Sequence, residues 1–460
     1  MRVMGCWGSW VRAGALACAL VAGVTAVTPA GSAAVAARSV SRSAITGHVS
    51  PIPAIGTPQL APTGSTEQVR QIAECGGRMY AVGTFSAIEW GGKTYARHNV
   101  FSFSATSPYQ ITSWDPDANG EVNSIALAPD CSYAWLGGNF TTVAGTSAAR
   151  IAKVSTITGA VATGAAHSAS RRVDTLLYTP NGHLLVGGEF TSINGSGRHF
   201  YASLNPVTGR DDGYLNLSIS GTYVYPGVEP NYTQAYNQQL SPDGRHVLVE
   251  GVFTSVQGQP RQQIFMLNLG ASNGNVSAWN SSEFTQHCVD AHPFYIKGAA
   301  WSPDQSTVYI GTTGEHLANW NGSFPFTGLC DAAAAFPSTQ VGGLTPEWVN
   351  YTGCDSLYSA AADASTLYVG GHERWANNPK GCNQPGPGAI PAPGLAGFTS
   401  QGSLLTSSNH TLGRYSRARG FGADDMLRTS AGLWIASDNF DGSNTCGGVF
   451  HPGICFLPNA

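Results

Sequence analysis

The stretch Leu185-Val186-Gly187-Gly188-Glu189-Phe190-Thr191-Ser192-Ile193 decides the fold, because copies of it recur along the chain. Three close copies share its apolar start, its small residues and its Phe-Thr or Phe-Ser step: Tyr80–Ile88, Trp135–Val143 and Leu248–Val256. Three shorter copies follow at Tyr309–Thr312, Tyr368–Gly371 and Trp434–Ser437. Such self-similarity is typical of a repeat architecture.

The repeat period and its surroundings predict the shape of each unit. The copies recur about every 60 residues, close to the ~40–50 residues of one four-stranded propeller blade. Each copy follows a short apolar strand and a turn, for example Pro129-Asp130 or Pro242-Asp243-Gly244, whose residues suit hairpin turns. A third strand and a variable fourth strand come after it. The sequence therefore predicts an all-β, seven-bladed β-propeller with four-stranded blades.

The two ends of the chain predict how the ring closes. The last unit supplies three strands, the third at Ile454–Pro458, and then the chain stops. The segment Gln59–Gly64 precedes the first unit as a fourth strand would, so we expect an N-terminal strand to complete the last blade and remove its free edge. The expected organisation is a flexible Ser-, Ala- and Pro-rich lead over residues 37–55 and one propeller domain over residues 56–460.

Residues 1–36 have the features of a secretory signal peptide. Two arginines precede a short uncharged apolar run, and a small-residue site ends at Ala36. The apolar run is shorter than the ~20 residues that a bilayer-spanning helix needs. We therefore expect a secreted, extracellular protein with no membrane insertion after removal of the signal.

The cysteines agree with an exported chain. Ten are present, and two of them lie in the predicted signal peptide. An even number of remaining cysteines indicates disulfides. Cys446 with Cys455 closes a short hairpin, and Cys75 with Cys131 joins the turns of two neighbouring blades. The pairing of four others is left open: Cys288, Cys330, Cys354 and Cys382.

Composition excludes some functions. The net charge is −4 and only 11% of the residues are charged, so a nucleic-acid partner is not expected. We expect neither a cofactor nor a metal: the group His287, Cys288, Asp290 and His292 suggests metal ligands, but Cys288 is expected to be oxidised. A monomer is expected.

The G-G-x-F-[TS]-x-[VI] units, together with the segment Tyr368–Pro379, resemble a family of secreted actinobacterial β-propeller proteins. The resemblance covers about residues 57–460. It implies export and a propeller fold. Members of this family are mostly uncharacterised and are often joined to carbohydrate-binding or immunoglobulin-like modules, and the resemblance brings no catalytic residues with it.

The fifth and sixth units carry irregular loops after their repeat strands. Each loop holds an acid, a histidine, an amide and a tryptophan, and both loops leave the same point of the blade. Tryptophan faces stack on sugar rings, while Glu, Arg and Asn hydrogen-bond hydroxyl groups. The candidate ligand-binding residues are Glu315, His316, Asn319, Trp320, His372, Glu373, Arg374, Trp375, Asn377 and Asn378.

A structural role for these loops, in which their side chains satisfy one another, is an alternative reading. Asp355, Asp424 and Asp425 begin inner strands, where such residues more often accept hydrogen bonds between blades than act on a substrate.

Three functions remain open on the sequence. The leading hypothesis is an extracellular binding protein with a carbohydrate ligand, held by the loops of blades five and six. The second is an extracellular polysaccharide hydrolase or lyase that uses Glu315 or Glu373 with a neighbouring histidine. The third is a scaffold that binds another secreted protein. No catalytic signature is present, so the sequence favours binding over catalysis without excluding an enzyme.

Overall fold

The computed structural model describes residues 48–222, 232–285, 288, 292–315, 328–405, 422–439, 445–447 and 449–460. The chain divides into two units, Met1–Ala37 and Arg38–Ala460, and every described residue belongs to the second. The predicted signal peptide and residues 37–47 of the predicted lead therefore lie outside the described residues. No helix in the described ranges is long and apolar enough to cross a membrane.

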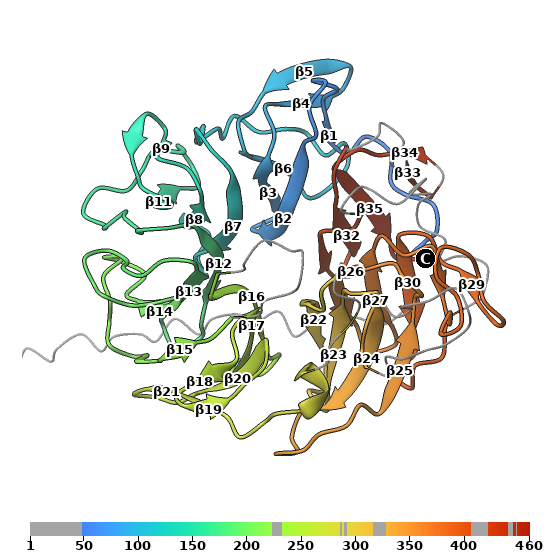
Figure 1. Ribbon diagram of the computed structural model, residues 1–460. Helices are drawn as coiled ribbons and strands as arrows, with labels where there is room; N and C mark the ends of the chain where they lie inside the picture. The colour runs from blue at the N-terminus through green and yellow to red at the C-terminus, as the bar shows by residue number, and fades with distance from the viewer. Residues whose placement is uncertain are drawn as a thin grey trace, which may run out of the picture. The chain divides into compact units, whose positions relative to one another are not determined.

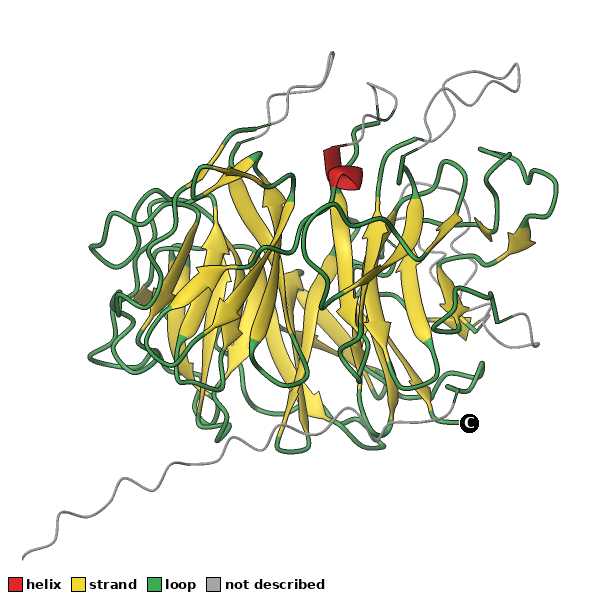
Figure 2. Ribbon diagram, turned by 90° about the horizontal axis from the view of Figure 1, so that it is seen from below, coloured by secondary structure: helices red, strands yellow, loops and turns green. Residues whose placement is uncertain are grey.

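The fold is all-β, and the only helix among the described residues is a 3-10 turn at Ser282–Thr285. Seven antiparallel sheets of the described chain follow one another around a common centre (Figure 1). Their innermost strands are β2 (Gln68–Cys75), β7 (Val122–Leu127), β12 (Val173–Tyr178), β16 (Gln234–Leu240), β22 (Ile296–Trp301), β26 (Leu357–Ala362) and β31 (Asp425–Arg428). Seen from the side, the strands lie between loops that cover the two opposite faces (Figure 2).

The second strand of each sheet is the repeated sequence unit. These strands are β3 (Arg78–Thr84), β8 (Tyr133–Gly138), β13 (Leu184–Gly188), β17 (His246–Val252), β23 (Thr307–Thr312), β27 (Leu367–Gly371) and β32 (Gly432–Ala436). The third strands are β6 (Val100–Ser104), β11 (Ile151–Ser155), β14 (Tyr201–Leu204), β20 (Ile264–Leu269), β24 (Ala332–Pro337), β30 (Leu395–Phe398) and β35 (Ile454–Pro458).

A fourth strand is present in two of these sheets, as β21 (Gly274–Val276) and β25 (Trp348–Tyr351). In four others the corresponding segment makes a single bridge to the third strand, for example Phe103 with Ile111. Short outer strands form separate small sheets: β1 (Gln59–Leu60), β4 (Ala87–Trp90) and β5 (Lys93–Ala96); β9 (Thr142–Val143) and β10 (Thr146–Ser147); β15 (Ile219–Ser220), β18 (Ser255–Val256) and β19 (Gln259–Pro260); β28 (Trp375–Ala376) and β29 (Ile390–Pro391); β33 (Thr445–Cys446) and β34 (Val449–Phe450).

The N-terminal segment differs from the prediction. Gln59 and Leu60 pair with β4, not with the last sheet. Residues 48–54 instead run beside β35: the amide of Ser50 donates to the carbonyl of Pro458, and Val49, with 1% of its surface exposed, bridges to Asn459. This part of the predicted flexible lead is ordered because β35 is an edge strand with unpaired N–H and C=O groups. Such groups hydrogen-bond to the main chain of a neighbouring segment, whatever its side chains are.

Apolar side chains fill the space between neighbouring sheets. One buried cluster joins the first and last sheets, and in it Phe103 meets the edge of Trp434, which stacks on Phe456 at 4.2 Å between ring centres. The last sheet therefore packs on the first in the same way as consecutive sheets pack on each other.

All eight cysteines of the described residues form disulfides. Cys75 bonds Cys131 and Cys446 bonds Cys455, which confirms both predicted pairs. The four cysteines whose pairing the sequence left undecided form Cys288–Cys330 and Cys354–Cys382. Because Cys288 is oxidised, it is no metal ligand, as the sequence argument expected.

Candidate functional site

A cavity of about 950 Å³ lies at the centre of the seven sheets and is lined by residues of all seven innermost strands or of the turns before them. A volume of this size matches the clefts that hold small molecules in proteins. The cavity is therefore the first place to look for a ligand site.

A β-bulge recurs in the innermost strands. In six of the seven sheets the pairing with the second strand skips one residue near the start of the inner strand. A bulge leaves its extra residue unpaired and re-aims that side chain. The skipped residues, called the bulge residues below, all line the cavity: Arg70, Asn123, Asp174, Tyr236, Lys297 and Tyr358. Asp424, just before β31, holds the equivalent place in the last sheet and also lines the cavity.

The bulge explains the glycine of the repeated sequence unit. A Cβ atom at Gly138 would collide with the carbonyl oxygen of Glu121, which comes just before the bulged strand β7. The same collision would occur between Gly371 and the carbonyl of Ser356. Glycine is the residue that permits such a close backbone approach. The glycine of the repeat therefore lies opposite a bulge in the inner strand, and the side chain of that bulge lines the cavity.

Ion pairs surround the polar end of the cavity. Arg70 Nη2 lies 2.6 Å from Glu121 Oε1, and Arg172 contacts Asp174 Oδ1 at 2.6 Å and Glu189 Oε1 at 2.8 Å. Burial raises the pKa of Asp174 to about 6, although Arg172 opposes the shift. Oδ2 of Asp174 has no hydrogen-bond partner. This buried oxygen is therefore an unsatisfied acceptor beneath the surface of the cavity.

Lys297 and Asp424 line the same end without an ion-pair partner among the described residues. The Lys297 ammonium lies over the ring of Tyr236, 4.3 Å from its centre. Burial lowers the pKa of Lys297, and the Asp424 charge opposes that shift. Burial raises the pKa of Asp424 to about 7. One donor group and one acceptor group therefore remain available to a ligand.

The opposite end of the cavity is mostly apolar. The later residues of several inner strands carry hydrocarbon side chains, although β16 keeps Gln238 and Gln239 there. The apolar lining includes Leu177, Leu240, Ala300, Trp301, Ala361, Met426 and Leu427. Polarity therefore changes along the axis of the cavity.

One family profile and two solved structures show similarity to parts or most of this chain. The profile of a family described as "Domain of unknown function (DUF5122) beta-propeller" matches residues 179–200. No curated protein sequence matches the chain. A structure of U3-55K is 10% identical with a TM-score of 0.48, and the match covers 88% of this chain and all of that one. The crystal structure of the RRP9 WD40 repeats is also 10% identical with a TM-score of 0.48, over 89% of this chain and 99% of that one.

The candidate loop of the sixth sheet is largely occupied by its own contacts. The Arg374 guanidinium makes two hydrogen bonds to Asp355, at 2.8 and 2.6 Å, and lies over the Trp375 ring at 4.7 Å. Asn378 is fully buried and accepts a bond from the amide of Gly386, while the exposed Asn377 donates to the carbonyl of Gly388. These four residues hold the loop together.

Glu373 is completely buried, and neither oxygen of its carboxyl group has a hydrogen-bond partner. Burial raises its pKa well above the usual range. A carboxyl group without access to the surface cannot reach a polysaccharide. Of the ten candidate residues, His316, Asn319 and Trp320 lie outside the described residues.

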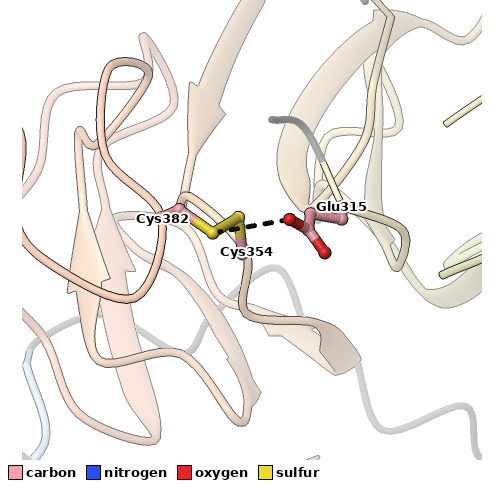
Figure 3. A group of neighbouring side chains, drawn as sticks. All are labelled: Glu315, Cys354 and Cys382. Atoms are coloured by element: carbon pink, nitrogen blue, oxygen red, sulfur yellow. Dashed lines mark hydrogen bonds between the residues drawn. A yellow bond between two sulfur atoms is a disulfide. The ribbon is translucent and has the colours of Figure 1, made fainter. Parts of the chain in front are cut away.

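Glu315 lies against the Cys354–Cys382 disulfide, with Oε1 3.6 Å from Cys382 Sγ (Figure 3). The three side chains come close enough to resemble a metal site. Both sulfurs are consumed by their covalent bond, however, so neither is a thiolate ligand. Burial raises the pKa of Glu315, and His292 opposes the shift. The contact supports the loop rather than a metal.

The two loops border the polar end of the cavity through one residue each. Glu315 Oε2 lies 3.4 Å from Nε2 of His292, which lines the cavity. The His372 ring meets the Tyr358 ring edge-on at 4.8 Å between centres. The loops that the sequence singled out are therefore neighbours of the central cavity.

The bulge residues and Asp424 are the site residues that the sequence motifs did not reveal, although Asp424 was placed at the start of an inner strand. A signal for them exists in the sequence. When the seven units are aligned on Gly188 and the residues that correspond to it, together five glycines, Thr312 and Ser437, a polar or aromatic residue follows the first apolar residue of every inner strand, as in Val69-Arg70, Val173-Asp174 and Ile296-Lys297. A short strand with a bulge does not alternate regularly between apolar and polar residues. The bulge residue therefore cannot be recognised from the period-2 pattern.

Proposed function

We propose that the protein is a secreted extracellular binding protein whose ligand is a carbohydrate, held at the polar end of the central cavity beside the loops of the fifth and sixth sheets. The proposal includes the finer reading of the fold: seven four-stranded blades, the last completed by the N-terminal segment, preceded by a cleaved signal peptide over residues 1–36. The protein is expected to act as a monomer.

The observation that carries the proposal is the pair Lys297 and Asp424. A sugar hydroxyl donates one hydrogen bond and accepts others, so a sugar can use both an ammonium donor and a carboxylate acceptor. Charge-assisted hydrogen bonds of this kind are the stronger ones in protein sites. Asn123, Gln234 and Asn237 add amide groups to the same lining, and the rings of Tyr236 and Tyr358 add surfaces on which a sugar can stack.

The loop residues keep a bordering role in the proposal. Through its contact with Tyr358, His372 helps to position a cavity-lining ring, and Glu315 does the same for His292. Arg374 covers one face of the half-buried Trp375 ring. Trp375 can therefore contribute only by stacking a sugar on its other face.

The test is a screen of bacterial and plant glycans with the purified, oxidised protein. Lys297→Met and Asp424→Asn are expected to lose at least tenfold in affinity, because a hydrogen bond to a charged group contributes about 1.5–3 kcal/mol. Lys93→Met, at an exposed position of β5, is the matched control and should bind like the wild type. Trp375→Ala reports separately on the loop.

Two results would overturn the proposal. One is a wild-type protein that binds no glycan, which favours a protein partner captured by the scaffold. The other is glycan binding that survives both Lys297→Met and Asp424→Asn. Turnover of a bound glycan would move the assignment to the hydrolase or lyase alternative.

A further inference from the structure

The polarity of the cavity changes in one direction, and the inner strands show why. β22 reads Ile-Lys-Gly-Ala-Ala-Trp and β26 reads Leu-Tyr-Ser-Ala-Ala-Ala, so each begins with a polar or phenolic side chain and continues with hydrocarbon. β31 follows Asp424 with Met426 and Leu427. Because all these strands start at the same end, their polar residues meet at one end and their apolar residues at the other.

Several polar groups near the apolar end already have partners, while the side-chain amide of Gln239 has none among the described residues. The Trp301 Nε1–H donates to the carbonyl of Gln239 at 3.2 Å, and the Ser241 hydroxyl donates to Asp243 at 2.6 Å. Arg428, 1% exposed at its side chain, is paired with the fully buried Asp363 at 2.9 Å. A ligand therefore meets few unused donors or acceptors there.

The apolar end of the cavity exposes hydrocarbon side chains. Leu177, Leu240 and Leu427 are only partly buried by the protein and face the cavity. Leaving such surface against water costs free energy in proportion to its area, and an apolar group that covers it recovers that free energy. Both ends belong to one continuous cavity, so a single molecule can reach both.

We infer that the cavity takes an amphiphilic glycoside, with its sugar at Lys297 and Asp424 and an alkyl or similar apolar aglycone against the apolar lining, to which the neighbouring third and fourth sheets contribute Leu177 and Leu240 and the last sheet contributes Leu427. The inference rests on the proposed carbohydrate function and narrows it to a class of ligand. A free sugar would fill the polar end alone and leave the apolar lining against water.

The experiment measures the affinity of a homologous series by calorimetry. The probes are methyl, butyl, hexyl and octyl β-D-glucopyranoside and the corresponding β-D-galactopyranosides, each below its micelle concentration. Burial of a methylene group is expected to raise the affinity roughly fourfold per methylene, until the tail is longer than the apolar lining.

Two variants separate the ends of the cavity. Leu240→Asn places an amide in the apolar lining and is expected to flatten the dependence on chain length while leaving the methyl glycoside unchanged. Lys297→Met is expected to weaken every member of the series by the same factor and to keep the dependence on chain length. Thermal unfolding of each variant shows whether it remains folded, and Leu240→Ala replaces Leu240→Asn if it does not.

Each outcome has one meaning. Equal affinity from methyl to octyl overturns this inference and leaves the carbohydrate function standing. A chain-length dependence that is unchanged in both Leu240 variants also overturns it. If no glycoside of any length binds and the glycan screen is blank as well, the inference and the proposed function fail together.

Discussion

Asp425 Oδ2 accepts a hydrogen bond of 2.9 Å from the backbone amide of Ile72, which links the innermost strand of the last sheet to that of the first. Equivalent bonds link earlier sheets: Gln71 Oε1 accepts from the amide of Ile125, and Ser124 Oγ accepts from the amide of Leu176. A side chain just after the bulge thus satisfies a backbone group of the next sheet. The expectation that inner-strand aspartates join blades is met by Asp425.

Replacement of Asp425 tests the importance of this link. Asp425→Ala is expected to lower the free energy of unfolding by about 2 kcal/mol, because the substitution leaves a part-buried amide without its charged acceptor. Asp425→Asn keeps an acceptor oxygen and should cost less. Denaturant unfolding measures both, with Glu89→Ala at an exposed position of β4 as the control. Equal stability of Asp425→Ala and wild type would show that the bond contributes nothing.

The raised pKa of Asp424 predicts a pH-dependent stability. Its pKa moves from 3.8 to about 7 in the folded protein, so the native state binds this proton more tightly than the unfolded chain does. Between these values the free energy of unfolding therefore falls as the pH rises. Asp424→Asn removes this contribution, so the stability of the variant relative to wild type should increase from pH 4 to pH 7.

Denaturant unfolding at several pH values checks the Asp424 prediction, and Glu89→Gln controls for the exchange of an acid for an amide. A difference between Asp424→Asn and wild type that stays constant with pH would contradict the burial of this carboxyl group.

Two disulfides should differ in their contribution to stability. Cys75 and Cys131 are separated by 56 residues, while Cys446 and Cys455 are separated by 9. In the chain-entropy account, closing the longer loop removes more freedom from the unfolded chain and contributes about 4 kcal/mol, against roughly 2.5 kcal/mol for the shorter one. Paired Cys→Ser variants compared by thermal unfolding should show this order, and the reverse order would point to native-state effects.

Glu373 offers a test of the catalytic alternative. Because its carboxyl group is fully buried and has no hydrogen-bond partner among the described residues, Glu373→Gln replaces one unpaired polar group by another of similar size. A change in stability of at most about 1 kcal/mol is expected, with ligand binding intact. Glu373→Lys introduces a charge into the same place and should destabilise the protein strongly. Melting temperature and glycan affinity report the two effects. Loss of activity in Glu373→Gln, with the fold retained, would restore this residue to a catalytic role.

The parts of the structure that the sequence predicted are those governed by local chemistry. The repeated strand with its glycine lies where the copies of Leu185–Ile193 placed it, and turns such as Pro242-Asp243-Gly244 join β16 to β17. The Cys75–Cys131 pair followed from two cysteines in equivalent turns of adjacent units. Each of these features depends on a few neighbouring residues or on a repeat.

The parts that escaped prediction depend on distant backbone pairing. Val49 was assigned to a flexible lead because its neighbours have a disordered composition, yet it bridges to Asn459 through main-chain groups that composition does not report. Arg374 was predicted to bind a ligand through its guanidinium group, but this group is hydrogen-bonded to Asp355. Lys297 was overlooked because a lysine in a short strand is ordinarily a surface residue.

The bulges have a consequence for how such a protein can diversify. A bulge residue has no partner in the ladder, so its exchange leaves the pairing of the two strands in place. Some of these side chains contact each other, since Asn123 donates to Asp174 and Lys297 lies over Tyr236, so the seven positions, one from each repeat, vary as an interacting set. Duplicated genes carrying this repeat can acquire new ligand preferences through single codon changes, and a combinatorial library limited to these seven codons would sample that potential in the laboratory.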